Sequence, residues 1–123
     1  MRLPKFQPRT IPEGTYRMEI HDWPEIRTNE RGEVYVIFKF MVYLGNGDKQ
    51  VIGHVIPPWQ DRYNDVLNLA GAKKDTNGDF ILDSVSIGAQ FMADVILVED
   101  KKDPTKKYIK IINFHSLEEK DMF

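Results

Sequence analysis

Alternating hydrophobic and polar residues mark most of this chain, and the clearest case lies between positions 34 and 44. Every second residue there is apolar: Val34, Val36, Phe38, Phe40, Val42 and Leu44. Because successive side chains of a strand point to opposite faces, this pattern predicts a strand with one face in the core. The opposite face then presents Tyr35, Ile37, Lys39, Met41 and Tyr43.

Shorter runs of the same kind set the order of elements along the chain. They predict strands over Gly14–Trp23, Glu33–Leu44, Lys49–Ile56, Gln90–Glu99 and Lys107–Phe114. Apolar residues at helical spacing predict a helix over Trp59–Gly71. Pro24–Gly32 is expected to be a polar loop, Gly45–Asp48 a tight hairpin, and Phe80–Leu82 part of a minor hairpin.

The predicted order is β-β-β-α-β-β, which is the element order of the OB-fold, a five-stranded, partly open Greek-key barrel. We therefore expect an all-β domain with one helix over residues 14–116, between an extended basic arm at 1–13 and an acidic tip at 117–123. Trp59 is expected to fill the bottom of the barrel, because tryptophan buries a large area in a small core.

Composition narrows the function classes. The chain has 123 residues, 41% of them hydrophobic, which is enough for one core. It has no cysteine, so disulfides, thiol catalysis and thiolate zinc sites are excluded. His21, His54 and His115 are too scattered to predict a metal site. With no apolar run of membrane-spanning length and no signal-peptide pattern, we expect a cytoplasmic protein without a membrane partner.

Charge and motifs do not point to catalysis. The net charge is −2, with basic residues gathered in positions 1–13 and acidic ones in positions 117–123. The chain has no phosphate-cradling glycine loop, no nucleophile elbow and no paired histidine–carboxylate motif. We therefore expect no enzyme activity and no cofactor.

Candidate binding residues gather on the polar face of the predicted second strand and in two loops. Aromatic rings stack on bases at about 1–3 kcal/mol per base, and cations follow the phosphates. In an OB-fold the second and third strands and the loops between strands one and two and between strands four and five take up oligonucleotides or oligosaccharides. The candidate nucleic-acid residues are Arg17, Trp23, Arg27, Arg31, Tyr35, Lys39, Tyr43, Lys101, Lys102, Lys106 and Lys107.

Five segments mark architectural positions of the predicted fold, namely Gly14–Tyr16, Val34–Leu44, Leu67–Gly71, Ile87–Gly88 and Phe91–Val98. In these segments the chain resembles a group of small phage-encoded OB-fold proteins of DNA replication and recombination. The resemblance spans most of the chain, from Gly14 to Phe114. The resemblance implies single-stranded DNA binding in phage DNA metabolism, in the host cytoplasm.

The end of the chain, Leu117–Phe123, is similar to the acidic, phenylalanine-terminated tips of bacterial single-stranded DNA-binding proteins. This resemblance implies that Glu119, Asp121, Met122 and Phe123 contact replication or repair proteins. Phe123 would enter an apolar pocket while basic residues around it hold the carboxylates. The alternative is a frayed terminus without a role.

Taken together, the patterns favour a single-stranded DNA-binding protein with little sequence preference. A structural or adaptor module that binds protein through Tyr35, Met41 and Tyr43 is the main alternative, since tyrosines also occur in strands for packing alone. Carbohydrate binding is a third hypothesis, because aromatic platforms also stack on sugars. Each of these three functions is compatible with a homo-oligomer.

Overall fold

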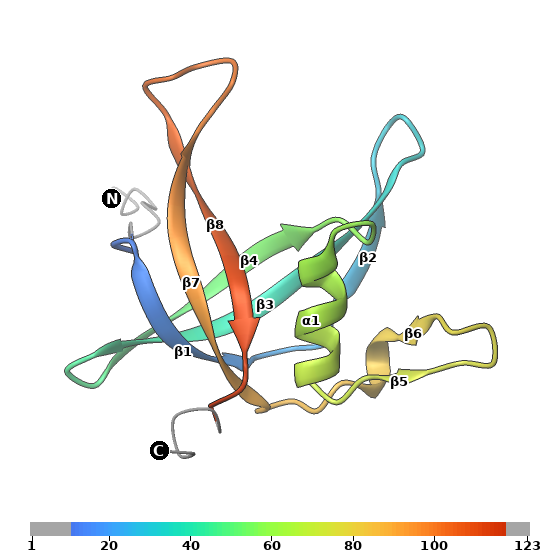
Figure 1. The fold of residues 1–123 in the computed structure, drawn as a ribbon. Coiled ribbons are helices and arrows are strands. Elements are labelled where there is room, and N and C mark those ends of the chain that lie inside the picture. The colour runs from blue at the N-terminus through green and yellow to red at the C-terminus, as the bar shows by residue number, and fades with distance from the viewer. Residues whose placement is uncertain (1–10, 118–123) are drawn as a thin grey trace, which may run out of the picture.

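The computed structural model describes residues 11–117 and is mostly β-strand with one α-helix in that range. Figure 1 shows the elements, which are β1 (Gly14–Ile20), β2 (Glu25–Thr28), β3 (Val34–Gly45), β4 (Asp48–Ile56), α1 (Asp61–Leu69), β5 (Lys73–Lys74), β6 (Phe80–Ile81), the short 3₁₀ helix Leu82–Ser84, β7 (Gln90–Glu99) and β8 (Lys107–His115). No helix within residues 11–117 has the length and apolar character needed to cross a bilayer.

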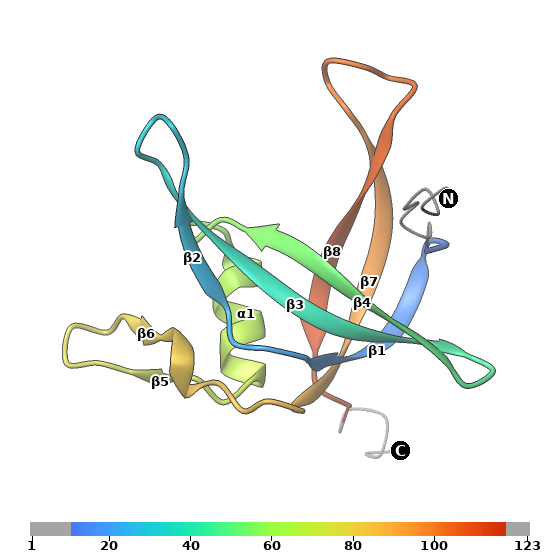
Figure 2. The same cartoon turned by 180° about the vertical axis from the view of Figure 1, so that it is seen from behind.

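The antiparallel sheet is organised around β3. Its main path runs β2-β3-β1-β7-β8, and β4 pairs with the other edge of β3. β3 is long enough to pair with β2 near its start and with β1 near its end, while β4 follows it almost throughout. The strands curl into a small barrel-like arrangement, with α1 packed against β8 (Figures 1 and 2).

The core confirms the alternation predicted for residues 34–44 over most of its length. Val36, Phe38, Phe40 and Val42 are buried, whereas Val34 and Leu44 at the ends are not fully covered. Phe40 lies at the centre, with ring centroids 5.8 Å from Phe38, 5.6 Å from Phe91 and 5.8 Å from Phe114. The helix adds its predicted apolar face, including Val66, Leu67 and Ala70.

One strand was missed by the sequence prediction. β2 lies inside the segment Pro24–Gly32 that was expected to be a loop, and it pairs antiparallel with the start of β3. All four of its residues are exposed, so it shows no core-directed alternation that a sequence pattern would reveal. The Asn29 side chain supports the turn that returns the chain to β3, since its Oδ1 accepts from the amides of Arg31 and Glu33 at 2.9 and 3.0 Å.

The prediction for Trp59 was wrong. This side chain is 74% exposed and does not fill the barrel. The chain turns after Pro57, whose carbonyl accepts from the Gln60 amide at 3.1 Å, and the helix begins only at Asp61. Trp59 therefore lies before the helix and off its apolar face. The helix also ends earlier than expected, at Leu69, and Gly71 follows with a left-handed φ of 75°.

Residues 11–13 extend the barrel rather than leaving it. Ile11 is buried, and the Pro12 carbonyl accepts from the Tyr16 hydroxyl at 2.7 Å. The Glu13 carboxylate accepts from the Leu97 amide at 2.9 Å, which ties this segment to β7. The remainder of the predicted arm, and residues 118–123 of the predicted tip with Glu119, Asp121, Met122 and Phe123, lie outside the described residues.

Candidate nucleic-acid interface

The outward side of β3 and β4 forms the surface that we call the β3–β4 face. Paired residues of an antiparallel ladder share a face, and the outward pairs here are Ile37–Val55, Lys39–Gly53, Met41–Val51 and Tyr43–Lys49, with Tyr35 at the end of the row. The five β3 residues of this face are all partly exposed. The predicted division of β3 into a core face and an outward face is therefore confirmed.

Gly53 leaves a gap in the row of β4 side chains. A Cβ atom built at this position would meet only Ile37 Cγ2, at 4.0 Å. Its neighbours on the same face, Val51 and Val55, are 42% and 43% exposed. A flat group can therefore approach the backbone beside Lys39 more closely than anywhere else along this row.

At one end of the face, Tyr43 contacts two side chains of β1, and one of these is held in turn by β7. The Arg17 guanidinium lies 4.4 Å from the centre of the Tyr43 ring, and the Tyr43 hydroxyl donates to Glu19 Oε1 at 2.8 Å. Gln90 Nε2 donates to the same oxygen at 3.0 Å. The hydrogen bonds from Tyr43 and Gln90 lower the pKa of the Glu19 carboxyl, and the bond to Glu19 raises the pKa of Tyr43.

This end of the face is also hollowed. A depression of about 350 Å³ lies between the side chains of β1 and the β3–β4 hairpin, lined by Arg17, Tyr43, Gly45, Gly47, Asp48 and Lys49. Arg17 of β1 and Lys49 of β4 are the cross-strand partners of Tyr43, so one cation lies on each neighbouring strand at this end of the face. A stacked base and its phosphate would find complementary groups here.

At the other end, Tyr35 has Arg27 of β2 as its cross-strand partner. Arg27 Nη2 also contacts Glu25 Oε1 at 3.1 Å, so its charge is partly balanced. Between the two ends, Lys39 Nζ lies 3.9 Å from Asp22 Oδ2, and the next residue, Trp23, is 54% exposed. The structure therefore gathers most of the β1–β3 candidates around one face.

The two candidate loops project towards the same end of the molecule, seen as the β2–β3 and β7–β8 turns in Figures 1 and 2. Their charges differ. Residues 29–33 hold Arg31 between two glutamates, a net charge of −1, so the expected basic character of this turn is not present. Residues 99–107 hold four lysines and three acids, a net charge of +1.

The β7–β8 loop keeps its lysines available. The Asp100 carboxylate accepts from the Lys102 amide at 2.9 Å, and the Asp103 carboxylate accepts from the Thr105 amide at 3.1 Å. These aspartates therefore shape the backbone of the loop. Within residues 11–117, no carboxylate lies within ion-pair distance of Lys101, Lys102, Lys106 or Lys107. Of the two candidate loops, this one therefore carries the net positive charge.

Two exposed aromatic residues were missed as candidates. Tyr108 is 53% exposed and, with Lys110, lines a hollow of about 320 Å³ between β4, β8 and the start of α1. Val55 belongs both to this hollow and to the β3–β4 face, so the two surfaces adjoin. Along β8, Tyr108 and Lys110 alternate with Ile109 and Ile111. This alternation indicates that Tyr108 lies on the outward face, and it could have identified Tyr108 as a candidate. Nothing local marks Trp59 as exposed.

A group of polar side chains closes the barrel beneath this hollow. Arg62 Nη1 donates to His54 Nε2 at 2.7 Å and to the Ile111 carbonyl at 2.8 Å, and its Nε donates to Gln60 Oε1 at 2.6 Å. The Ile111 amide donates to His54 Nε2 at 3.4 Å. Arg62 of α1 and His54 of β4 thus provide hydrogen-bond partners for the carbonyl and the amide of Ile111 in β8. Burial lowers the pKa of His54 to about 4, and the positive charges of Arg62 and Lys110 add to the effect.

This group predicts acid sensitivity in a defined range. An unfolded histidine has a pKa near 6.5. Between pH 6.5 and pH 4, His54 is therefore protonated in the unfolded chain and neutral in the folded chain. The free energy of unfolding should therefore fall by about 3 kcal/mol across that range, the loss being complete below the folded pKa. Urea denaturation at a series of pH values measures it.

The matched variants for this prediction are His54→Gln and His21→Gln. Glutamine still offers an oxygen to Arg62 but does not titrate, so His54→Gln should flatten the dependence between pH 6.5 and 4. His21 is exposed, and its replacement should leave the dependence unchanged. A wild-type slope in the His54→Gln protein would contradict the assignment.

Comparison with known proteins identifies no family for this chain. No protein family model matches the chain, and a search of the curated proteins finds no significant match. Among residues 11–117, no three histidine, aspartate or glutamate side chains lie close enough together to hold a metal ion.

Proposed function

We propose that this chain is a single-stranded DNA-binding protein with an OB-fold-like barrel and little sequence preference. The observation that supports it best is the pairing of an aromatic ring with a cation at each end of the β3–β4 face, Tyr35 with Arg27 and Tyr43 with Arg17. Lys39 lies between them on the same face. Rings for stacking and cations for phosphates are the two components of sequence-tolerant single-strand binding.

The topology supports the OB-fold assignment. With β2 counted as part of the first loop and the β5–β6 hairpin as an insertion, the main elements follow the order β1, β3, β4, α1, β7, β8. This is the predicted β-β-β-α-β-β order. The β3–β4 face then corresponds to the second and third strands, and the β7–β8 loop to the loop between strands four and five, which are the ligand-binding parts of that fold.

A protein-binding module is the second candidate, because the middle of the same face is apolar. Ile37, Met41, Val51 and Val55 surround Lys39 and Gly53. An apolar protein interface responds little to salt, whereas salt weakens every phosphate contact and so lowers the affinity for nucleic acid. The salt dependence of binding therefore separates the two functions.

The deciding experiment is fluorescence anisotropy of labelled oligo-dT at a series of salt concentrations. We expect binding whose logarithmic affinity falls linearly with the logarithm of salt, by about 0.7 for each phosphate contacted. Duplex DNA of the same length should bind more weakly, because its bases are not free to stack. Absence of oligo-dT binding at low salt, or an affinity independent of salt, would overturn the proposal.

The β7–β8 loop makes a separate prediction about this slope. Replacing Lys101, Lys102 and Lys106 together by glutamine should reduce the salt slope by about 0.7 for each phosphate that a lysine had neutralised, and so by about 2 if all three touch phosphates. Replacing Lys73 of β5 by glutamine is the control, because β5 lies away from the β3–β4 face (Figure 1). An unchanged slope in the loop variant would place the strand elsewhere on the molecule.

The cellular role that we propose is DNA replication or recombination, in a phage. It depends on the resemblance of the architectural segments. Contact with replication or repair proteins through Glu119, Asp121, Met122 and Phe123 depends on the resemblance of the tip. A pull-down from host lysate with full-length protein and Phe123→Ala side by side tests the tip. Identical partner lists would end the recruitment proposal and leave DNA binding untouched.

A further inference from the structure

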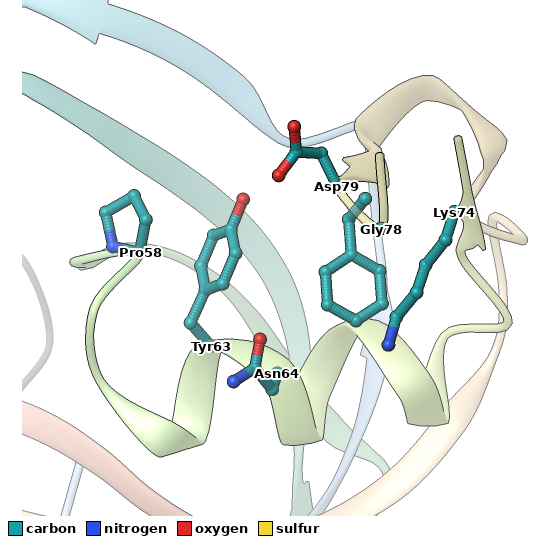
Figure 3. Close-up of a pocket in the computed structure, with 7 residues that line it drawn as sticks. Pro58, Tyr63, Asn64, Lys74, Gly78 and Asp79 are labelled. Carbon is teal, nitrogen blue, oxygen red and sulfur yellow. The ribbon is translucent and has the colours of Figure 1, made fainter. Parts of the chain in front are cut away.

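A further concave site lies on α1, away from the β3–β4 face. It is a pocket of about 520 Å³ between the helix and the β5–β6 hairpin, lined by Pro58, Tyr63, Asn64, Lys74, Gly78, Asp79 and Phe80 (Figure 3). This volume lies in the range of small-molecule sites, about 300–1,000 Å³. Neither the β3–β4 face nor the β7–β8 loop contributes to it.

The aromatic walls of the pocket are anchored to the core. The Phe80 ring packs edge-to-face on Tyr63, with centroids 6.3 Å apart, and Tyr63 packs edge-to-face on buried Phe38 at 6.0 Å. The hairpin that bears Phe80 is closed by Asp75, whose Oδ1 accepts from the amides of Asn77 and Asp79 at 2.9 and 3.0 Å. The walls are therefore formed before any ligand arrives.

Four polar side chains of the pocket have hydrogen-bonding capacity that a ligand can use. They are the Tyr63 hydroxyl, the Asn64 amide, the Lys74 ammonium and the Asp79 carboxylate, and within residues 11–117 none of these side chains makes a hydrogen bond to another protein group. Lys74 Nζ is held 4.9 Å from the centre of the Phe80 ring. In Figure 3 the Asp79 carboxylate points towards the Tyr63 hydroxyl, and the Lys74 ammonium lies well apart from it.

We propose that this pocket binds a guanine base. Tyr63, Phe80 and Pro58 supply the apolar surface for a flat ring, and the two opposite charges select the base. Guanine presents two adjacent N–H donors, N1 and N2, which one carboxylate accepts together, and its O6 and N7 atoms accept from a lysine. Thymine presents a single N–H between two carbonyl oxygens, which a carboxylate repels. Asp79 is therefore the residue that distinguishes guanine from thymine, and Lys74 donates to the O6 and N7 acceptors of guanine.

The experiment is an NMR titration of the full-length protein with dGMP and, separately, dTMP. The two nucleotides carry the same phosphate, so a difference between them reports the base. We expect dGMP to shift the amides of Tyr63, Asn64 and Phe80 and to bind about 5- to 150-fold more tightly than dTMP, which is the discrimination of one bidentate pair. Asp79→Asn should abolish this preference, and the exposed Asp83→Asn should keep it.

A second pair of variants tests the cation. Lys74→Met should weaken dGMP binding, whereas Lys73→Met, its neighbour outside the pocket, should not. Equal affinity for dGMP and dTMP, shifts confined to Lys39 and Gly53, or a preference that survives in Asp79→Asn would each overturn the inference. These outcomes are independent of oligo-dT binding, so failure here leaves the proposed function standing, and the reverse also holds.

Oligonucleotides distinguish the two sources of the base. If the guanine belongs to a bound strand, oligo-dT with one central dG should shift the same pocket amides as dGMP, and plain oligo-dT should not. If the ligand is a free nucleotide, dGMP alone should shift them. Both results support a guanine site and differ only in what delivers the base.

Discussion

Replacing Tyr35 and Tyr43 together by alanine is expected to weaken oligo-dT binding by about 25-fold or more. Each ring stacked on a base contributes a factor of about 5 to 150 in affinity. Both side chains lie on the outward side of β3 and are partly exposed, so their loss should leave the core intact. Fluorescence anisotropy gives the affinity, and far-ultraviolet circular dichroism with a thermal melt checks the fold.

The matched control keeps both rings. Tyr35→Phe with Tyr43→Phe removes the hydroxyl that donates to Glu19 but preserves the stacking surface, so it should retain most of the affinity. Unfolding of the alanine variant would mean that the two faces of β3 are assigned the wrong way round. Full affinity in that variant would remove the β3–β4 face from the proposed site.

Gly53 gives an independent test of the same surface without removing any side chain. Its φ lies outside the left-handed region, and a Cβ atom there would meet only Ile37 Cγ2 at 4.0 Å, so alanine is compatible with the fold and a longer side chain would extend over the outward face. Leucine would fill the gap beside Lys39 and should weaken oligo-dT binding, whereas alanine should have little effect. Equal affinities of the two variants would show that bases do not approach the sheet here.

Phe40→Ala is expected to lower the free energy of unfolding by about 3–5 kcal/mol. Its ring is fully buried and touches the rings of Phe38, Phe91 and Phe114. Three strands meet at this position, because Phe40 pairs with Ile20 of β1 and Ile52 of β4. The cavity left by the ring would therefore be lined by rigid elements that collapse little. Urea denaturation measures the change.

Val34→Ala is the control on the same strand. Val34 shares the alternation of Phe40, but it lies at the start of β3 and is 48% exposed. Its truncation should change the free energy of unfolding by no more than about 0.5 kcal/mol. A loss at Val34 comparable with that at Phe40 would mean that this end of β3 is covered in solution, as a homo-oligomer through this end would require.

Local pattern determined the parts of this protein that depend on neighbours along the chain. The two faces of β3 follow from a side-chain period of two, which is a property of the extended backbone itself. The hairpin at Asn46 and Gly47 was also predictable, since both residues adopt the positive φ that such a turn requires. The order of the main elements, and with it the candidate face, therefore came from the sequence alone.

Tertiary structure decided everything that depends on register between distant segments. Arg17 meets Tyr43, and Arg27 meets Tyr35, only because β1 and β2 pair with β3 at those positions, and a shift of one residue would reverse each face. The exposed strand β2 and exposed Trp59 escaped the pattern because packing elsewhere placed them outside the core. His54, Arg62 and Ile111 come from three elements, and the Asp79–Lys74 pocket joins a helix to a hairpin. Such groups form through long-range contacts, which no window of sequence contains.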